Sequence, residues 1–398
     1  MIGMSRRILS KSLQSFPSLI KAPITRISPA TLNQGFRTSL RSFSDSQKSA
    51  TMELPEGILM GFGNPLLDIT CTVEDNVMLE KYGLDANAAI VAEEKHDVLF
   101  DELMNMENVI YSAGGACQNS MRIFQWIVQT PFRAVFSGAV GKDKLGDRIE
   151  KRARADGLLT LYQLKEELPT GSCAVIINGP NRSLVANLGA ASLFTEDWVD
   201  DEENTCALER AKFFYFTGFF LAVCANVVEQ VAVMCSESNR IAILNFSAVF
   251  VLQMHKDTVA ELIQYVDIII CNKEEAIAFA DSNDWKTKNI FEIGSRLQKM
   301  PKANVRPRLV MITDAVCPVL VFQDNDRVLE YPVPKVTRGP VFDTNGCGDA
   351  FVGGFLAMFV QRMPLDYCIR TGIFASQQIL NVVGVQIEKL PKFSEKCI

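Results

Sequence analysis

The chain reads Asp343-Thr344-Asn345-Gly346-Cys347-Gly348-Asp349-Ala350-Phe351-Val352-Gly353-Gly354-Phe355 near its carboxyl end, a polar, glycine-rich turn that runs directly into an apolar helical stretch. Glycines on both sides of Cys347 permit a tight backbone path. The free amides of a first helical turn attract anions. The segment therefore predicts an anion hole formed by the backbone of Gly346, Cys347 and Gly348.

Asp349 follows this turn and would stand beside a bound phosphate. A carboxylate there can accept the proton of an attacking hydroxyl while the amides stabilise the charge of the migrating phosphoryl group. This pattern favours phosphoryl transfer, in which positioning and electrostatics supply most of the rate. Taken alone, the motif favours a simpler interpretation, in which Asp349 is only an acid that stabilises the start of a helix.

Three further segments place polar side chains beside expected strands or helix starts. An apolar strand leads into the segment Gly61-Phe62-Gly63-Asn64-Pro65-Leu66-Leu67-Asp68. Asn64 and Asp68 could hold sugar hydroxyls there. Alternatively, the segment is an ordinary turn with a surface acid. Gly114-Gly115-Ala116-Cys117-Gln118-Asn119 offers close backbone approach and an amide at a helix start. Asn272-Lys273-Glu274-Glu275 either caps a helix or organises magnesium through water.

Short apolar runs alternate with helical periodicity from Ile58 onward, which predicts a three-layer α/β/α core with a mainly parallel sheet. The expected strands are Ile58–Phe62, Arg133–Gly138, Phe213–Thr217, Ile241–Asn245, Asp267–Cys271 and Leu309–Thr313. Helices are expected at Leu145–Ala155 and Leu365–Leu380, with Gly157 marking a helix end.

Two stretches, around 83–92 and 158–190, break this rhythm with short extended segments and turn signals but no helical pattern. Within the second, Pro169-Thr170-Gly171 and Asn178-Gly179-Pro180-Asn181 mark the turns. We expect a small β subdomain inserted into the core, which could act as a lid over a ligand cleft.

Composition excludes several other classes of protein. Hydrophobic residues make up 48% of the chain and charged residues 22%, which is typical of a globular protein. The longest apolar run, Phe213–Cys224, is too short to cross a bilayer, so no membrane association is expected. Eleven scattered cysteines favour a reducing compartment, and two histidines are too few for a His-rich metal site. No P-loop, dinucleotide-binding or protein-kinase motif is present.

Residues 1–51 differ from the rest of the chain in composition. They hold eleven serines, eight of the 40 basic residues and one of the 46 acidic residues, which is typical of a mitochondrial transit peptide. The alternative is a disordered extension, with translation starting at Met52 and a cytoplasmic or nuclear protein. The expected catalytic domain is 52–398. It carries 32 basic and 45 acidic residues, a balance that argues against nucleic acid as a partner.

Together these segments resemble the ribokinase-like (PfkB) carbohydrate and nucleoside kinases, in particular the members that phosphorylate adenosine. The resemblance covers nearly all of Ile58 to Phe393. Its most specific parts are 63–68, 181–188, Gly218-Phe219-Phe220-Leu221 and 343–354. It implies transfer of the γ-phosphate of ATP to the 5′-hydroxyl of adenosine, giving AMP in purine salvage. Magnesium is the implied cofactor, and a monomer is implied.

The resemblance also implies roles for individual residues. Asp349 would be the base, and Arg182 in the lid would reach the transferring phosphate. Asn64, Asp68, Gly115 and Asn119 would hold the ribose, and Cys173, Leu184 and Phe219 would surround the adenine ring. On the ATP side, Thr313 and Asn345 match nucleotide-contacting positions, while Asn272 and Glu275 match the family's phosphate and magnesium-water motif.

Four departures from the adenosine-phosphorylating pattern affect the expected site. Ala116 lacks a hydroxyl that these kinases usually carry, and Ala89 stands where they often have glutamine. Cys347 replaces an alanine between the two anion-hole glycines, and Ala315 lies in a turn that usually contains glycine. Two alternatives therefore stay open: a kinase of the same family acting on another nucleoside or a sugar, and a nucleoside-binding homologue with little catalysis.

Overall fold

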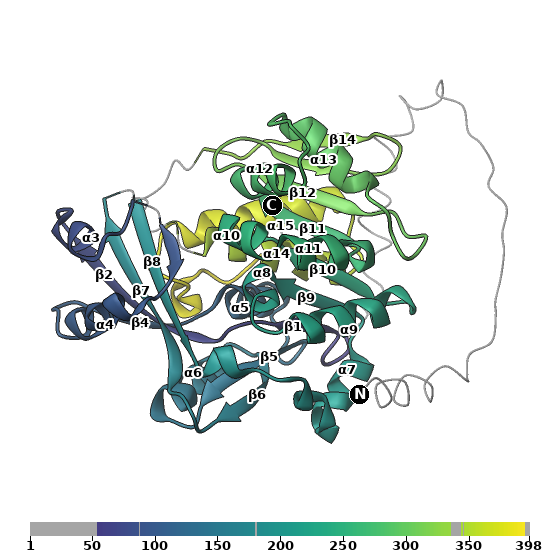
Figure 1. Cartoon of the computed structure of the whole chain (residues 1–398). Helices are drawn as coiled ribbons and strands as arrows, with labels where there is room; N and C mark the ends of the chain where they lie inside the picture. The colour runs from purple at the N-terminus through teal and green to yellow at the C-terminus, as the bar shows by residue number, and fades with distance from the viewer. Residues whose placement is uncertain (1–53, 87, 180, 336–343, 345, 395–398) are drawn as a thin grey trace. The chain divides into compact units, whose positions relative to one another are not determined.

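Two β-sheets organise the residues that the computed structural model describes, which are 54–394 except 87, 180, 336–343 and 345 (Figure 1). The larger sheet has nine strands in the order β14-β13-β12-β11-β10-β9-β1-β5-β6. From β6 to β12 every neighbouring pair is parallel, and β13 and β14 add an antiparallel edge. The expected α/β fold with a mainly parallel sheet is confirmed.

All six strands expected from sequence are present in the larger sheet. The strands of this sheet are β1 (Leu59–Phe62), β5 (Ala134–Gly141), β6 (Leu159–Lys165), β9 (Phe213–Thr217), β10 (Ile241–Asn245), β11 (Ile268–Asn272), β12 (Leu309–Thr313), β13 (Val319–Phe322) and β14 (Val328–Tyr331). Their side chains alternate between two buried faces, so Leu244 packs into one core layer and Ile243 into the other.

Helices cover both faces of this sheet. One face packs against α7 (Glu202–Arg210), α9 (Ala225–Ser236), α11 (Lys256–Leu262), α12 (Lys273–Ser282) and α13 (Ile290–Lys299). The other packs against α5 (Ala116–Val128), α14 (Cys347–Val360) and α15 (Leu365–Ile379), with α6 (Lys144–Ala155) contributing Ala153. The two helices expected from sequence are α6 and α15. Gly157 has a φ of +87°, which suits the chain reversal after α6.

A smaller sheet lies to the left of the larger one in Figure 1. Its strands, in spatial order, are β3 (Ala89–Val91), β8 (Asn181–Gly189), β7 (Thr170–Asn178), β2 (Leu66–Val73) and β4 (Ile110–Gly114). The short helices α3 (Val77–Tyr82) and α4 (Asp97–Met104) pack on one face of it. Two further short helices, α8 (Gly218–Leu221) and α10 (Val249–Met254), follow β9 and β10.

The smaller sheet differs in extent from the segments expected to form a separate β subdomain. Within 158–190, β6 pairs in parallel with β5 and so belongs to the larger sheet, because α6 provides the crossover of a βαβ unit. Conversely, β2 and β4 come from outside both expected segments and pair with each other, while β2 also pairs with β7. The smaller sheet is therefore built from four separate parts of the chain.

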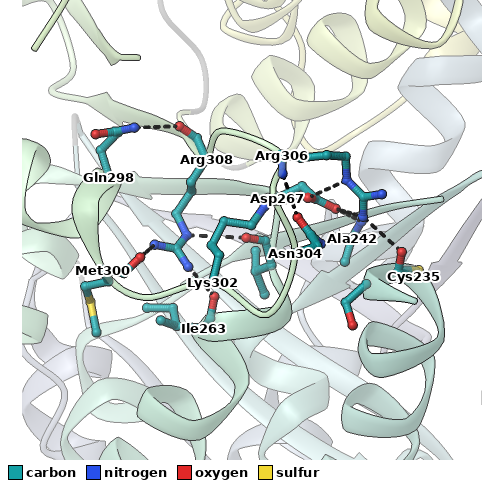
Figure 2. Close-up of polar contacts among 12 residues, drawn as sticks. Cys235, Ala242, Ile263, Asp267, Gln298, Met300, Lys302, Asn304, Arg306 and Arg308 are labelled. Carbon is teal, nitrogen blue, oxygen red and sulfur yellow. Dashed lines mark hydrogen bonds and ion pairs between the residues drawn. The ribbon is translucent and has the colours of Figure 1, made fainter. Parts of the chain in front are cut away.

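A buried ionic cluster links residues around the amino ends of β11 and β12 in the larger sheet (Figure 2). Asp267, directly before β11, accepts from Lys302 Nζ at 2.6 Å and from Arg306 Nε at 3.0 Å. Its other oxygen accepts from the Ala242 amide of β10 at 3.1 Å. Arg308, fully buried, donates to five backbone carbonyls around it. This cluster lies at the opposite end of the parallel strands from the site described next.

The described residues contain neither a membrane-spanning helix nor a cluster of metal-binding side chains. No helix among them combines the length and the apolar character that a bilayer span requires. Within the same described ranges, His, Cys, Asp and Glu side chains form no group of three or more that could hold a metal ion.

Candidate active site

A cavity of about 350 Å³ lies where the carboxyl ends of the parallel strands face the smaller sheet. The last residues of three neighbouring strands line it: Thr217 of β9, Asn245 of β10 and Asn272 of β11. Carboxyl ends of parallel strands share one edge of a sheet, which is where α/β proteins commonly bind ligands. From the smaller sheet, β2, β3, β7 and β8 contribute the opposite wall, and Ala89 of β3 is among the lining residues.

The cavity brings together nearly all the site residues predicted from the sequence. Those that line it are Asn64, Asp68, Gly115, Asn119, Cys173, Arg182, Leu184, Phe219, Asn272, Glu275, Thr313, Gly346, Gly348 and Asp349. Cys347 is not among the lining residues, because its thiol faces away, toward the carbonyl of Ser376 on α15 at 3.7 Å. Asn345 lies outside the described residues.

The start of α14 exposes backbone amides beside the cavity. Gly346 has a φ of +76°, and an added Cβ would lie 2.4 Å from Cγ2 of Val385, so only glycine fits there. An added Cβ at Gly348 would meet nothing within 4 Å. The Ala350 amide makes a helical bond, to the Gly346 carbonyl at 2.7 Å. Amides before it, such as those of Gly348 and Asp349, therefore point out of the helix end, as anion binding requires.

Asp349 occupies the first turn of α14 and is half-buried. Burial raises the pKa of its carboxyl group to about 6, although the Asn119 side chain and the charge of Arg182 act in the opposite direction. Asn119 Nδ2 donates to Asp349 Oδ2 at 3.1 Å. A carboxylate with this pKa is ionised at neutral pH and still basic enough to take a proton.

Asp68 and Asn64 lie on the side of the cavity nearest the smaller sheet. Asp68 is buried on β2, and an added Cβ on Gly114 would lie 2.1 Å from Asp68 Oδ1, so a glycine there leaves room for the acid. Asn64 Nδ2 donates to the Phe219 carbonyl at 3.1 Å. Its Oδ1 is buried and has no hydrogen-bond partner among the described residues. This oxygen is thus an acceptor available to a ligand hydroxyl.

The backbone at the start of α5 approaches this pocket closely. Gly115 has a φ of +92°, and an added Cβ would lie 2.1 Å from the Asn64 carbonyl oxygen. The conformation and the close contact each require glycine. The turn thereby places Asn119, one helical turn later, at the cavity wall and within hydrogen-bond distance of Asp349.

Apolar groups form a second part of the same cavity. Phe219 lies 6.0 Å from Phe250, measured between ring centroids, and both rings line the cavity. Cys173 and Leu184 face it from the smaller sheet. Burial raises the pKa of the Cys173 thiol well above its ordinary value, so this group stays neutral and apolar. Such a surface suits a flat, uncharged ring.

Asn272 and Glu275 form a reciprocal cap at the start of α12. Asn272 Oδ1 accepts from the Glu275 amide at 2.8 Å, and Glu275 Oε2 accepts from the Asn272 amide at 2.9 Å. Burial raises the pKa of Glu275 to about 7. Both residues also line the cavity. The capping alternative is therefore correct for the local structure, and it fixes the carboxylate at the cavity wall.

Sequence reasoning missed the polar turn after β10. Asn245 Oδ1 accepts from the Ser247 amide at 3.0 Å, and Ser247 Oγ accepts from the Gly218 amide at 2.9 Å. Ser247 has a φ of +70°, a strained conformation that is concentrated at functional sites. Both side chains line the cavity. The signal was present, because Asn245 ends an expected strand of the parallel sheet.

Comparisons with known proteins agree with this architecture. The pfkB family carbohydrate kinase model matches residues 77–392. Adenosine kinase 2 of Arabidopsis thaliana is 38% identical over 340 residues, covering 85% of this chain and 98% of that protein.

Two solved structures of adenosine kinases are also similar. The Anopheles gambiae enzyme in complex with P1,P4-di(adenosine-5) tetraphosphate has a TM-score of 0.82 and 43% identity, over 85% of this chain and 100% of that one. The Schistosoma mansoni enzyme in complex with 2-fluoroadenosine has a TM-score of 0.81 and 31% identity, over 84% and 98%.

Proposed function

Because the chain belongs to the pfkB family of carbohydrate kinases, we propose that it is an adenosine kinase, which transfers the γ-phosphate of ATP to the 5′-hydroxyl of adenosine. One observation carries the proposal: Asp349 stands at an amide-rich helix start, in a cavity that also offers buried sugar-binding groups and an apolar wall. The products are AMP and ADP.

At the acceptor, Asp349 takes the proton of the 5′-hydroxyl as the bond from that oxygen to the γ-phosphorus forms. The bond from the γ-phosphorus to the β,γ-bridging oxygen breaks, and ADP leaves with the electron pair. Asn119 holds the carboxylate in place through its bond to Oδ2. Positioning of this kind supplies much of the rate in phosphoryl transfer.

Around the nucleoside, Asp68 and the free Oδ1 of Asn64 accept hydrogen bonds from ribose hydroxyls. Gly115 allows the ribose to approach the backbone. Phe219, Cys173 and Leu184 enclose the adenine ring. Ala116 also lines the cavity, and its missing hydroxyl removes one possible bond to the nucleoside, worth about 0.5–1.5 kcal/mol.

On the phosphate side, the amides of Gly346, Cys347 and Gly348 form the anion hole, and Arg182 balances charge on the migrating group. The Cys347 amide donates to the Thr344 carbonyl at 3.4 Å, a long bond that it would exchange for the phosphate. Its thiol points toward α15 and leaves the phosphate path clear. Thr313 contacts the nucleotide. Ala315 has a φ of +44°, which explains why a glycine suits this turn, and it is not among the described residues lining the cavity. Asn345 is proposed as a nucleotide contact from its sequence match alone.

Magnesium would be held through water by Glu275, with Asn272 beside it. One carboxylate on this side of the cavity is enough for the ion, because magnesium usually keeps several water ligands. When bound, the ion neutralises charge on the ATP phosphates.

A product assay tests this function. The purified chain is incubated with magnesium-ATP and each member of a panel of nucleosides and sugars, and phosphorylated products are separated and quantified. We expect AMP to form, with adenosine giving the highest kcat/KM. A higher value for another nucleoside or a sugar would overturn the substrate assignment. Tight adenosine binding without phosphorylation would indicate the nucleoside-binding alternative, which Ala116 keeps open.

We also propose that the chain acts as a monomer and that residues 1–51 direct it to mitochondria. The first proposal is supported by the family resemblance alone. The second is supported by the basic, serine-rich composition of the segment. A chain starting at Met52 would remain in the cytoplasm or nucleus.

A further inference from the structure

A second cavity, of about 370 Å³, lies apart from the candidate active site. Parts of β2, β4, α5, α6 and the segment after α15 form its walls. None of its lining residues has a role in the reaction proposed above. It is as large as the nucleoside and nucleotide cavity, so a small metabolite fits inside.

Positive charge distinguishes this second cavity. Arg148, Lys151 and Arg152 share one face of α6, because residues three and four apart in a helix are neighbours. Arg152 pairs with Asp156 at 2.6 Å and with Glu388, at 2.5 Å. Arg148 and Lys151 form no ion pair with a carboxylate among the described residues, so the cavity retains two uncompensated positive charges.

A fourth cation, Arg122 of α5, closes the inner wall. It is 1% exposed and pairs with Asp156 at 2.7 Å. Its Nη2 donates to the Val385 carbonyl at 3.0 Å, and Val385 also lines the cavity. Buried arginines of this kind hold their surroundings in one arrangement, because leaving the charge unpaired is costly.

Two neutral groups extend the recognition surface. The Tyr111 ring lies 5.3 Å from the Arg148 guanidinium group, measured to the ring centroid. Ser112 borders the cavity too, and its buried hydroxyl group has no hydrogen-bond partner among the described residues. An aromatic ring beside two free cations and a hydroxyl suits a phosphate group carried on a small organic molecule.

We propose that this cavity binds a small phosphate-bearing anion, with Arg148 and Lys151 providing the charge that holds the phosphate. The free phosphate ion and a nucleoside monophosphate share this chemistry.

A connected series of bonds leads from this cavity to the active site. Arg122 Nη1 donates to Asn119 Oδ1 at 3.3 Å, and Asn119 Nδ2 donates to Asp349 Oδ2 at 3.1 Å. A ligand that shifts Arg122 therefore shifts the amide that holds the proposed base. This part of the inference rests on the proposed function, with Arg122 as a positioning residue.

Calorimetry on the full chain tests the binding site. Saturating adenosine and a non-hydrolysable ATP analogue with magnesium first fill the active site, and AMP or inorganic phosphate is then titrated in. We expect one equivalent of at least one probe to bind, and higher salt to weaken that binding. Replacing both free cations, Arg148→Gln with Lys151→Gln, should weaken it at least tenfold. The matched double variant Lys142→Gln with Lys144→Gln removes two exposed charges outside the cavity and should bind within twofold of the parent chain.

Absence of binding by both probes, or equal loss in the two double variants, would overturn the site. AMP binding alone would identify a nucleotide ligand, and phosphate binding alone the free ion, and both results support the proposal. The readout needs no turnover, so a chain that fails to phosphorylate adenosine can still pass this test.

Kinetics test the connection separately. The bound probe should change kcat/KM for adenosine and move its pH midpoint in the parent chain. In the Arg148→Gln, Lys151→Gln variant, the same probe concentration should leave the pH midpoint unchanged. Its only effect on kcat/KM should be the inhibition that AMP, as the product of the reaction, exerts at the active site. Arg122→Lys keeps the charge but loses the forked geometry, so it should retain binding and lose the kinetic response. A probe that binds without any kinetic effect on the parent chain would overturn the connection.

Discussion

Asp349 must meet two requirements at the scale of a single residue: it must be dehydrated enough to be basic, and ionised enough to act at neutral pH. Burial raises the pKa of its carboxyl group, and Asn119 and Arg182 limit that rise. The result is a pKa of about 6 at the start of a helix whose amides face the cavity. The balance depends on groups from α5, α14 and β8.

Asp349→Asn separates the chemical role of this carboxylate from its structural one. Asparagine keeps the shape and an oxygen to accept the Asn119 bond, so the fold should persist. It cannot take a proton, and kcat should fall by about 10²–10⁴. Steady-state kinetics with thermal unfolding measure both effects. Because a desolvated charge disappears, the unfolding midpoint of Asp349→Asn above pH 6 should be equal to or higher than that of the parent chain. If Asp349→Asn does not fold, Asp349→Ser, which has a smaller side chain, replaces it in the kinetic test.

The pH dependence of kcat/KM follows from the same pKa. Asp349 must be ionised, so activity should be constant well above pH 6 and fall about tenfold per pH unit below it. Asn119 lowers the pKa of Asp349, so Asn119→Ala should move the midpoint to higher pH. A midpoint unchanged in Asn119→Ala but altered in Glu275→Gln would instead assign the limb to Glu275, whose pKa is about 7.

The sequence predicted which residues at the ends of strands belong to the site, but it did not predict where their side chains point. Asp349, Asp68 and Asn64 could be predicted because each follows a glycine-rich turn or an apolar strand. The outward thiol of Cys347 depends on the rotation of α14 against α15, which no local pattern encodes. Ser247 escaped notice because its importance comes from a positive φ and a bond to the distant Gly218 amide.

At the scale of elements, the start of α14 offers a contrast between two glycines. Gly348→Ala meets no neighbour within 4 Å and adds helix propensity, so stability should be kept or raised by about 0.5–1 kcal/mol. The new methyl group stands beside the proposed anion hole, so kcat with ATP should fall. Gly346→Ala should instead destabilise the fold, through its positive φ and the contact with Val385. Unfolding in urea and initial rates distinguish the Gly348→Ala and Gly346→Ala variants. Full activity in Gly348→Ala would contradict the proposed position of the phosphate.

The ionic cluster at the other end of the sheet should matter for stability and not for chemistry. Asp267→Asn leaves Lys302 and Arg306 without their carboxylate, and Arg306 is partly exposed, so the loss should be near the lower end of the range for buried pairs, about 3 kcal/mol. Asp284→Asn, in the exposed pair with Lys286, is the matched control and should leave the urea midpoint unchanged. Equal midpoints for the two variants would show that the cluster contributes nothing.

Elements with strong apolar runs were predictable, and those defined by distant pairing were not. β9 to β12 are buried on both faces and read as continuous apolar segments. β14 is a half-exposed edge strand held by its antiparallel partner β13, so its sequence alone gives a weak signal. β6 was predicted as part of a separate β subdomain, because its sequence does not show that the chain returns through α6 to pair β6 with β5.

On the scale of the whole molecule, both cavities are lined by residues that are distant in sequence but belong to the same compact unit. The active-site cavity is lined by residues from 64 to 351, and the second by residues from 67 to 388. The described residues from 54 to 394 form one compact unit. Every described residue that lines either cavity lies between 64 and 388, so mitochondrial targeting and catalysis should be separable.

A chain that begins at Met52 tests that separation. It should match the full-length chain in unfolding midpoint and, within about twofold, in kcat/KM for adenosine, because every described residue of the cavity is retained. With a fluorescent protein fused to the carboxyl end, full-length chain should enter mitochondria and the shorter chain should not. Replacing Arg6, Arg7, Arg37 and Arg41 by glutamine in the full-length chain is the control, since loss of positive charge should abolish import without shortening the segment. If all three fusions share one location, the segment is no transit peptide; if the shorter chain loses activity, residues before Met52 belong to the catalytic unit.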